Sequence, residues 1–136
     1  MTDRVFIDSN VVIYTLNATL PQYRIATELL LQRPVISVQM VNETINVQVR
    51  KLKRPLAAAQ EVAIFLMDGC EVVSLEPRDI QQAIELTRQY SLSHWDALIV
   101  ATALRAGCGT LYSEDMQHGL WITPALQILN PFSDWH

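Results

Sequence analysis

Residues 4–10 read Arg4-Val5-Phe6-Ile7-Asp8-Ser9-Asn10, a short apolar run that leads directly into a carboxylate, a hydroxyl and an amide. The apolar run predicts a strand that is buried on both faces, as in a parallel sheet covered by helices. Open α/β sheets bind ligands just beyond the carboxyl ends of their strands. We therefore expect Asp8 to lie in a functional site.

The rest of the chain alternates short apolar or β-branched segments with longer segments of helical periodicity. Strands are predicted over residues 5–7, 35–38, 70–75, 110–113 and, as an edge strand, 126–129. Helices are predicted over residues 21–32, 40–53, 56–67, 77–90 and 94–106. This alternation predicts an α/β fold with three layers, α/β/α, around a central parallel sheet of four or five strands.

Length and composition narrow the class of protein further. The chain has 136 residues, and we expect a single domain over 1–136. It has no apolar run as long as the ~18–20 residues of a membrane helix, and no signal peptide, so we expect a cytoplasmic protein without a membrane partner. Cys70 and Cys108 lie in apolar surroundings and are expected to be reduced core residues, which argues against a zinc site. The net charge of −4 argues against a generally basic nucleic-acid surface, but it leaves room for a cation that meets the phosphates.

Four acidic residues share one placement, at the end of a predicted strand or the start of a predicted helix: Asp8, Glu43, Asp96 and Asp115. Glu43 is expected in the first turn of helix 40–53. Strand carboxyl ends and the following helix amino ends lie at one edge of a parallel sheet, so we expect the four carboxylates to converge there. Such a cluster is electrostatically costly unless it holds a cation or its carboxylates share protons, and its oxygen ligands suit Mg²⁺ or Mn²⁺.

Each acidic residue also has a purely structural interpretation. Asp96 can belong to a capping box that begins at Ser93, and Glu43 can interact with the helix dipole. Asp8 and Asp115 can stabilise turns. Four such coincidences at one sheet edge are less expected than one shared site.

Four segments resemble, in order, the four motifs of PIN-domain nucleases: residues 6–10, 37–43, 95–103 and 111–115. The resemblance spans nearly the whole chain and is strongest to VapC-type toxins of type II toxin–antitoxin systems. The third motif, Asp96 at the start of an Ala-rich apolar helix, is the most specific of the four. The fold that this resemblance implies is the PIN-like α/β/α sandwich.

The resemblance implies a metal-dependent endoribonuclease, a hydrolase that holds Mg²⁺ or Mn²⁺ and cleaves RNA. It implies that the same residues are catalytic and metal-binding, directly or through water: Asp8, Glu43, Asp96 and Asp115. Asn10 and Ser113 match polar positions that orient ligands or a water. Many relatives carry another acidic residue where this chain has Gln117, so a fifth carboxylate is missing unless Glu114 replaces it.

A toxin of this type also implies a cognate antitoxin protein as partner. The apolar segments 11–16 and 56–67 exceed what a small monomer buries. Together with the resemblance, they predict a homodimer and a groove for an antitoxin helix.

Two further groups of residues have competing interpretations. A basic cluster is predicted at the end of helix 40–53, either to contact RNA phosphates or to complement the helix dipole: Arg50, Lys51, Lys53 and Arg54. The tryptophans are expected in the core or at an interface rather than as base-stacking platforms, because no basic run surrounds them: Trp95, Trp121 and Trp135.

Two other functions compete with a nuclease. A PIN-like scaffold that binds protein or RNA without cutting is favoured by Gln117 and disfavoured by the four intact acidic residues. A receiver-like signalling domain also gathers carboxylates at strand ends. It would need a later lysine, and no lysine follows Lys53.

Overall fold

The computed structural model describes residues 4–133. Within this range the strands are β1 (Val5–Ile7), β2 (Val35–Ser37), β3 (Glu71–Val73), β4 (Thr110–Tyr112), β5 (Trp121–Ile122) and β6 (Leu126–Leu129). The α-helices are α1 (Ser9–Ile13), α2 (Tyr23–Leu30), α3 (Val38–Arg50), α4 (Leu56–Gly69), α5 (Pro77–Gln89) and α6 (His94–Arg105). A single 3₁₀ turn, η1 (Tyr14–Leu16), follows α1.

The strands form one sheet in the order β3-β2-β1-β4-β6-β5. Every pair is parallel except β5 with β6, which are antiparallel. The predicted parallel sheet is therefore confirmed, with five parallel strands. It gains one short strand, β5, so 126–129 is not the edge strand that we expected. The chain order reverses on the two sides of β1, which places a ligand-binding crevice at the carboxyl end of β1.

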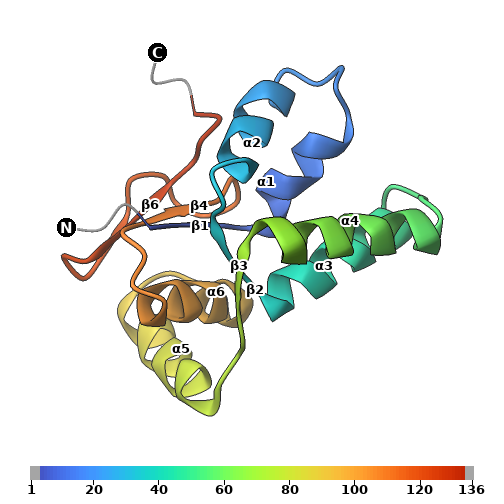
Figure 1. Ribbon diagram of the computed structural model, residues 1–136. Coiled ribbons are helices and arrows are strands. Elements are labelled where there is room, and N and C mark those ends of the chain that lie inside the picture. Colours follow the sequence, from blue (N-terminus) through green and yellow to red (C-terminus); the bar gives the residue numbers. More distant parts are fainter. Residues whose placement is uncertain (1–3, 134–136) are drawn as a thin grey trace.

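The sheet separates two hydrophobic cores, as the alternation of side chains along a strand requires. In β1, Phe6 packs in the core beneath α5 and α6, while Ile7 packs in the core shared by α1 to α4. Val35 and Ile36 of β2 divide in the same way. Helices thus cover both faces, with α5 and α6 below the sheet and α1 and α2 above it in the view of Figure 1.

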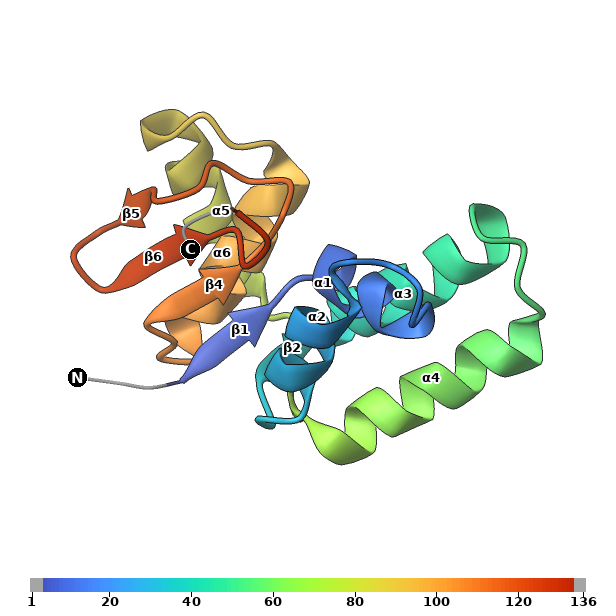
Figure 2. The ribbon, with the colours of Figure 1, turned by 90° about the horizontal axis from the view of Figure 1, so that it is seen from above.

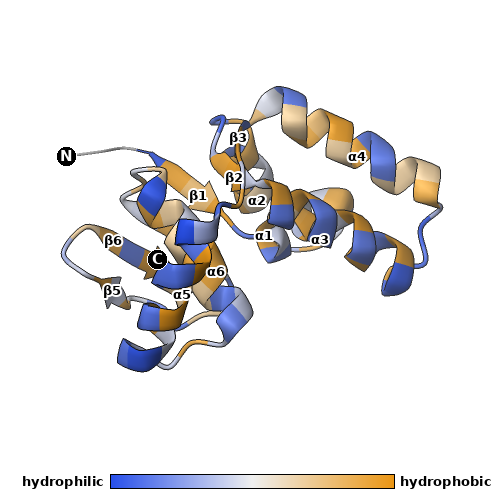
Figure 3. Ribbon diagram, turned by 90° about the horizontal axis from the view of Figure 1, so that it is seen from below, coloured by the Kyte–Doolittle hydropathy of each residue, from blue (hydrophilic) through white to orange (hydrophobic). Residues whose placement is uncertain are grey.

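Helices α3 and α4 pack against each other as a hairpin that extends away from the sheet (Figure 2). Helix α3 begins at Val38, two residues earlier than predicted, because Ser37 caps it: the Ser37 hydroxyl accepts a hydrogen bond of 3.1 Å from the Met40 amide. Helix α4 is largely apolar along its length (Figure 3), and Ile64, Phe65 and Met67 are exposed on it.

Several local predictions are confirmed. Ser93 caps α6 through a 3.1 Å bond from the Asp96 amide to its hydroxyl, and Pro77 occupies the first turn of α5. Cys70 and Cys108 are free and buried, and burial raises the pKa of each thiol to about 11. None of the helices in the described range is long and apolar enough to cross a membrane.

Candidate active site

The four predicted acidic residues come to the same edge of the sheet from four different elements. Asp8 follows β1 and caps α1, and Asp115 lies just after β4. Asp96 is in the first turn of α6, as predicted. Glu43 is in the second turn of α3, so our expectation of the first turn is wrong, because the Ser37 cap starts the helix earlier. The four carboxylates are close enough to interact: the charges of Glu43 and Asp96 raise the pKa of Asp8. The charges of Asp115 and Glu43 likewise raise the pKa of Asp96.

Asp8 is the most buried of the four, with 4% of its surface exposed. Burial raises the pKa of its carboxyl group to about 6. Hydrogen bonds from the Ser9 amide and the Ser113 hydroxyl lower this pKa, and the nearby charges of Glu43 and Asp96 raise it. The chain therefore holds a carboxylate in a place where its ionised form is disfavoured, which is typical of functional sites.

A shared amide joins Asp8 to Asp115. The Asn10 side-chain nitrogen lies 3.3 Å from one Asp8 oxygen, 3.3 Å from the Ser113 hydroxyl and 3.1 Å from an Asp115 oxygen. The Ser113 hydroxyl donates to the same Asp8 oxygen over 3.0 Å. Asn10 and Ser113 therefore lie between two of the acidic residues. Their bonds fix the orientation of both carboxylates.

Glu43 is held by two residues to which the sequence analysis gave no role. The Ser9 hydroxyl donates to one carboxylate oxygen over 3.1 Å, and the Gln39 amide donates to the other over 3.2 Å. Gln39 and Glu43 are four residues apart on α3, so helical spacing alone is a signal for this contact. Ser9 directly follows Asp8, and it links the Glu43 carboxylate to the β1 end of the site.

Asp96 combines a structural and an electrostatic role. Its amide is capped by Ser93, so the structural interpretation of this position is confirmed. Burial raises the pKa of its carboxyl group, a hydrogen bond from Ser93 lowers it, and the charges of Asp115 and Glu43 raise it further. Capping therefore coexists with membership of the acidic cluster.

Glu114 does not replace the missing fifth carboxylate. One of its oxygens accepts a 2.7 Å bond from the Tyr14 hydroxyl, and this bond raises the pKa of Tyr14 to about 12. The backbone amide of Glu114 donates to the Asn10 side-chain oxygen over 3.1 Å. Glu114 thus binds to the 3₁₀ turn after α1. Gln117, the position at which the resemblance implies a further acidic residue, is exposed.

The fit of a divalent cation rests on donor chemistry. Among residues 4–133, no three acidic, histidine or cysteine side chains are close enough to surround one ion. The four carboxylates nevertheless offer only hard oxygen donors, which suit Mg²⁺ or Mn²⁺. A cation would also offset the mutual repulsion and the burial that raise the pKa values of Asp8 and Asp96. The residues therefore fit such an ion when water completes its coordination.

The predicted basic cluster does not form one helix face. Helix α3 ends at Arg50, and Lys51 is its C-cap. Lys53 has a φ of 55° in the following loop, and the Arg54 guanidinium donates to the Gln48 side chain. The cluster lies at the end of α3 that points away from the sheet, about 10 Å along the helix from Glu43. Arg50, Lys51 and Lys53 are exposed.

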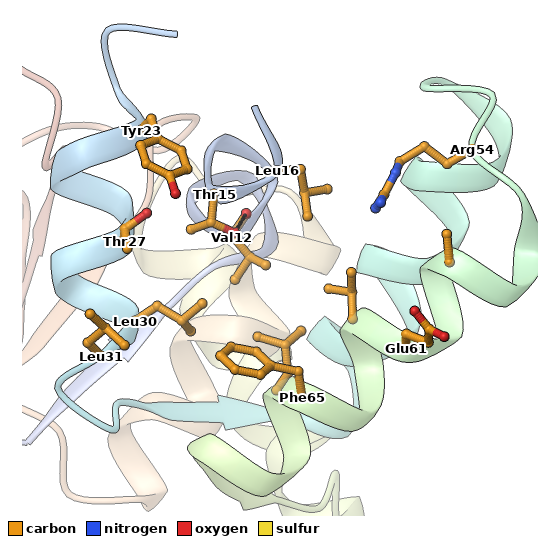
Figure 4. Close-up of a pocket in the computed structure, with 13 residues that line it drawn as sticks. Val12, Thr15, Leu16, Tyr23, Thr27, Leu30, Leu31, Arg54, Glu61 and Phe65 are labelled. Carbon is orange, nitrogen blue, oxygen red and sulfur yellow. Dashed lines mark hydrogen bonds between the residues drawn. The ribbon is translucent and has the colours of Figure 1, made fainter. Parts of the chain in front are cut away.

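A second surface feature is an apolar groove of about 340 Å³ between α1, α2 and α4 (Figure 4). Val12, Leu30 and Phe65 line its walls, and Arg54 and Glu61 place charges at its α4 side. The Thr27 hydroxyl also lines the groove, and it is a buried oxygen for which the described residues supply no hydrogen-bond partner. The two segments that were predicted to be too apolar for a monomer, 11–16 and 56–67, both contribute to the groove, together with α2.

Solved structures of similar fold are toxins and toxin–antitoxin complexes. VapC20 of Mycobacterium tuberculosis, a toxin that cleaves the sarcin–ricin loop, is 23% identical, with a TM-score of 0.65 over 82% of this chain and 89% of that one. A toxin–antitoxin complex from Klebsiella pneumoniae is 19% identical, with a TM-score of 0.71 over 94% of this chain and 98% of that one. DNA-bound VapBC from Salmonella typhimurium is 19% identical, with a TM-score of 0.68 over the same shares, 94% and 98%.

No curated protein matches the chain. The family model of the PIN domain, however, matches residues 5–118. This range covers most of the chain and contains all four acidic residues together with Asn10 and Ser113. The chain belongs to the PIN domain family.

Proposed function

We propose that this protein is a Mg²⁺- or Mn²⁺-dependent endoribonuclease and the toxin of a toxin–antitoxin pair. The observation that carries the proposal is the hydrogen-bonded network in which Asn10 joins Asp8 to Asp115 at the sheet edge that also receives Glu43 and Asp96. Membership of the PIN domain family and the likeness in fold to VapC20, a toxin that cleaves the sarcin–ricin loop, support it.

Four residues would hold the ion, directly or through water: Asp8, Glu43, Asp96 and Asp115. When bound, a divalent ion acidifies a water molecule and offsets the charge that develops on a phosphoryl group. A carboxylate of the cluster accepts the proton from the attacking water. Asn10 and Ser113 keep Asp8 and Asp115 in place during this transfer. Ser9 and Gln39 do the same for Glu43.

Hydrolysis by water sets the chemistry of the product ends. Since water and not the RNA 2′-hydroxyl is the nucleophile, each cut leaves a 5′-phosphate and a 3′-hydroxyl. A 2′,3′-cyclic phosphate on the products would contradict this mechanism.

The partner in the proposal is an antitoxin that places an amphipathic helix in the apolar groove between α1, α2 and α4 (Figure 4). Apolar walls would receive the apolar face of the helix, and Arg54 and Glu61 would meet polar residues at its border. The toxin–antitoxin complexes among the solved structures of similar fold support this assignment.

A homodimer is the second assembly that we propose. Ile80 and Ile84 are exposed on α5, on the opposite face of the sheet from the groove, and they offer an apolar surface to a second copy. Light scattering of the purified chain tests this, and a strict monomer at high concentration would contradict it. The proposal places the protein in the cytoplasm, where the free thiols of Cys70 and Cys108 stay reduced.

The experiment is cleavage of a panel of structured RNAs by the pure protein with Mg²⁺, Mn²⁺ or EDTA. Asp8→Asn and Asp96→Asn are the test variants, and Asp68→Asn on the exposed end of α4 is the matched control. We expect cutting that needs the metal, is lost in both test variants and persists in the control. A protein that neither binds metal nor cuts any RNA would favour the non-catalytic scaffold. Gln117 is the feature of the sequence that favours this alternative.

A further inference from the structure

Trp95 is the large apolar residue of α6 that is not buried in the core. Its side chain is 65% exposed, although it directly precedes Asp96. Of the two expected locations, the core is therefore excluded for Trp95 and for the exposed Trp121, the interface is untested, and Trp135 lies outside the described residues. The His94 ring contacts the Trp95 ring edge to face, with centroids 5.6 Å apart, so the indole has a supported position at the surface.

Trp95 lines a cleft of about 470 Å³ that opens beside the acidic cluster. Glu43 is one of the lining residues, so the cleft and the proposed metal site share a wall. Val38 and Leu75 add apolar contacts, and the amide side chains of Gln39, Asn42 and Asn46 complete the lining. The volume lies within the range of about 300–1,000 Å³ that small-ligand sites occupy.

This lining has the chemistry of a nucleobase site. An exposed indole stacks on any base, and a carboxamide both donates and accepts hydrogen bonds as a base edge does. None of the residues that line the cleft is basic, and the chain carries a net charge of −4. The cleft therefore offers no basic side chain to a phosphate, whereas its indole and amide groups suit a base.

We infer that Trp95 stacks on an unpaired nucleotide next to the scissile phosphate, while Asn42 and Asn46 contact the edge of that base. This inference rests on the proposed ribonuclease function and names the part of the RNA that the site recognises. It makes Trp95 a residue that positions the substrate and selects the cleavage site. The surface is shared with no other proposed partner, because the apolar groove lies at α1, α2 and α4.

The test compares Trp95→Ala and Trp95→Phe with wild type on single-stranded and hairpin RNAs that each carry one cleavage site. Trp121→Ala is the matched control, since Trp121 is 54% exposed on β5 and lies outside the cleft. In parallel, each nucleotide next to the cleaved bond is replaced by an abasic residue. Light scattering of every variant reports its oligomeric state.

We expect Trp95→Ala to lower kcat/KM by about tenfold or more, in line with the loss of one base–aromatic stack. Trp95→Phe should retain most of the activity, and Trp121→Ala should retain all of it. At one position, the abasic RNA should lower kcat/KM of the wild type by a similar factor. The same abasic RNA should not lower kcat/KM of Trp95→Ala any further, because both changes remove the same contact.

Three outcomes would overturn the inference. Cleavage by Trp95→Ala at the wild-type rate, or abasic effects that multiply with the variant at every position, would show that the ring does not stack on the substrate. A changed oligomeric state of Trp95→Ala would assign the ring to an interface between copies. A wild type that neither binds Mn²⁺ nor cleaves any RNA would overturn the proposed function as well, and this result is distinct from the other two.

Discussion

Replacing Asp8 by asparagine should abolish cleavage and yet stabilise the metal-free protein. Burial raises the pKa of the Asp8 carboxyl group from 3.8 to about 6. A carboxyl group whose pKa is higher in the folded state lowers the free energy of unfolding as the pH rises from about 4 to about 6. Each pKa unit corresponds to about 1.4 kcal/mol, so the ionised Asp8 costs up to about 3 kcal/mol at neutral pH.

Asparagine recovers only part of this cost. Its side-chain oxygen can keep the bond from the Ser9 amide, and the Ser113 hydroxyl can turn to accept from the new NH₂ group. The Asn10 amide, however, would then face another donor across 3.3 Å. We therefore expect a net gain of about 1–2 kcal/mol, which corresponds to a rise in Tm of about 3–7 °C for a chain of this size.

The assay is calorimetric unfolding in EDTA at pH 7.5 and at pH 3.5, with Asp68→Asn as control. The gain should appear at pH 7.5 and turn into a loss of about 1–2 kcal/mol at pH 3.5, because Asp8 is then protonated in the folded state and only the unfavourable contact with Asn10 remains. Adding Mg²⁺ or Mn²⁺ at pH 7.5 should stabilise the wild type and leave Asp8→Asn unchanged. Two results would refute the reasoning: an Asp8→Asn variant that is less stable than wild type in EDTA at pH 7.5, or a gain in stability that is the same at both pH values.

Three further predictions concern other parts of the chain. Thr27→Val should raise the free energy of unfolding by about 1 kcal/mol in urea titrations, because it removes a buried hydroxyl that no residue of 4–133 bonds; a loss would contradict this. Arg105→Ala should lower the free energy of unfolding by about 3 kcal/mol, because it removes the cation that pairs with the buried Asp79. Asp79 is 2% exposed and accepts a hydrogen bond of 2.7 Å from Arg105. Burial raises the pKa of Asp79, but the Arg105 bond and charge lower it overall, so this cost should shrink as pH falls below about 4 and Asp79 is protonated. Arg50→Glu with Lys51→Glu should weaken RNA binding and flatten its salt dependence if the basic cluster contacts phosphates; unchanged binding would leave these residues a structural role at the end of α3.

Local patterns were sufficient to predict the order of strands and helices. Helical periodicity and strand composition are properties of neighbouring residues, so helices such as α5 and strands such as β6 appear close to their predicted bounds. Strand β5 was missed because it has only two residues, Trp121 and Ile122, and a strand of this length shows no alternation of apolar and polar residues. The start of α3 was misplaced because the cap at Ser37 is a single hydrogen bond.

The sequence was sufficient to name the acidic residues and the neighbouring Asn10 and Ser113, but not the contacts that Ser9 and Tyr14 make. Parallel topology brings strand ends to one edge, and that rule was enough to group Asp8 with Asp115. The bonds from Ser9 to Glu43 and from Tyr14 to Glu114 join residues 34 and 100 positions apart, so no local pattern reports them. The exposure of Trp95 likewise depends on how α3 and α6 meet.

The central claim is that four carboxylates form one metal-dependent ribonuclease site. Its most direct test is Mn²⁺ affinity and RNA cleavage measured on the same preparations of wild type, the control Asp68→Asn and four single variants: Asp8→Asn, Glu43→Gln, Asp96→Asn and Asp115→Asn. We predict that each of the four loses at least tenfold in both quantities and that the control loses neither. Cleavage that continues in EDTA, or in a variant that no longer binds Mn²⁺, would contradict the account.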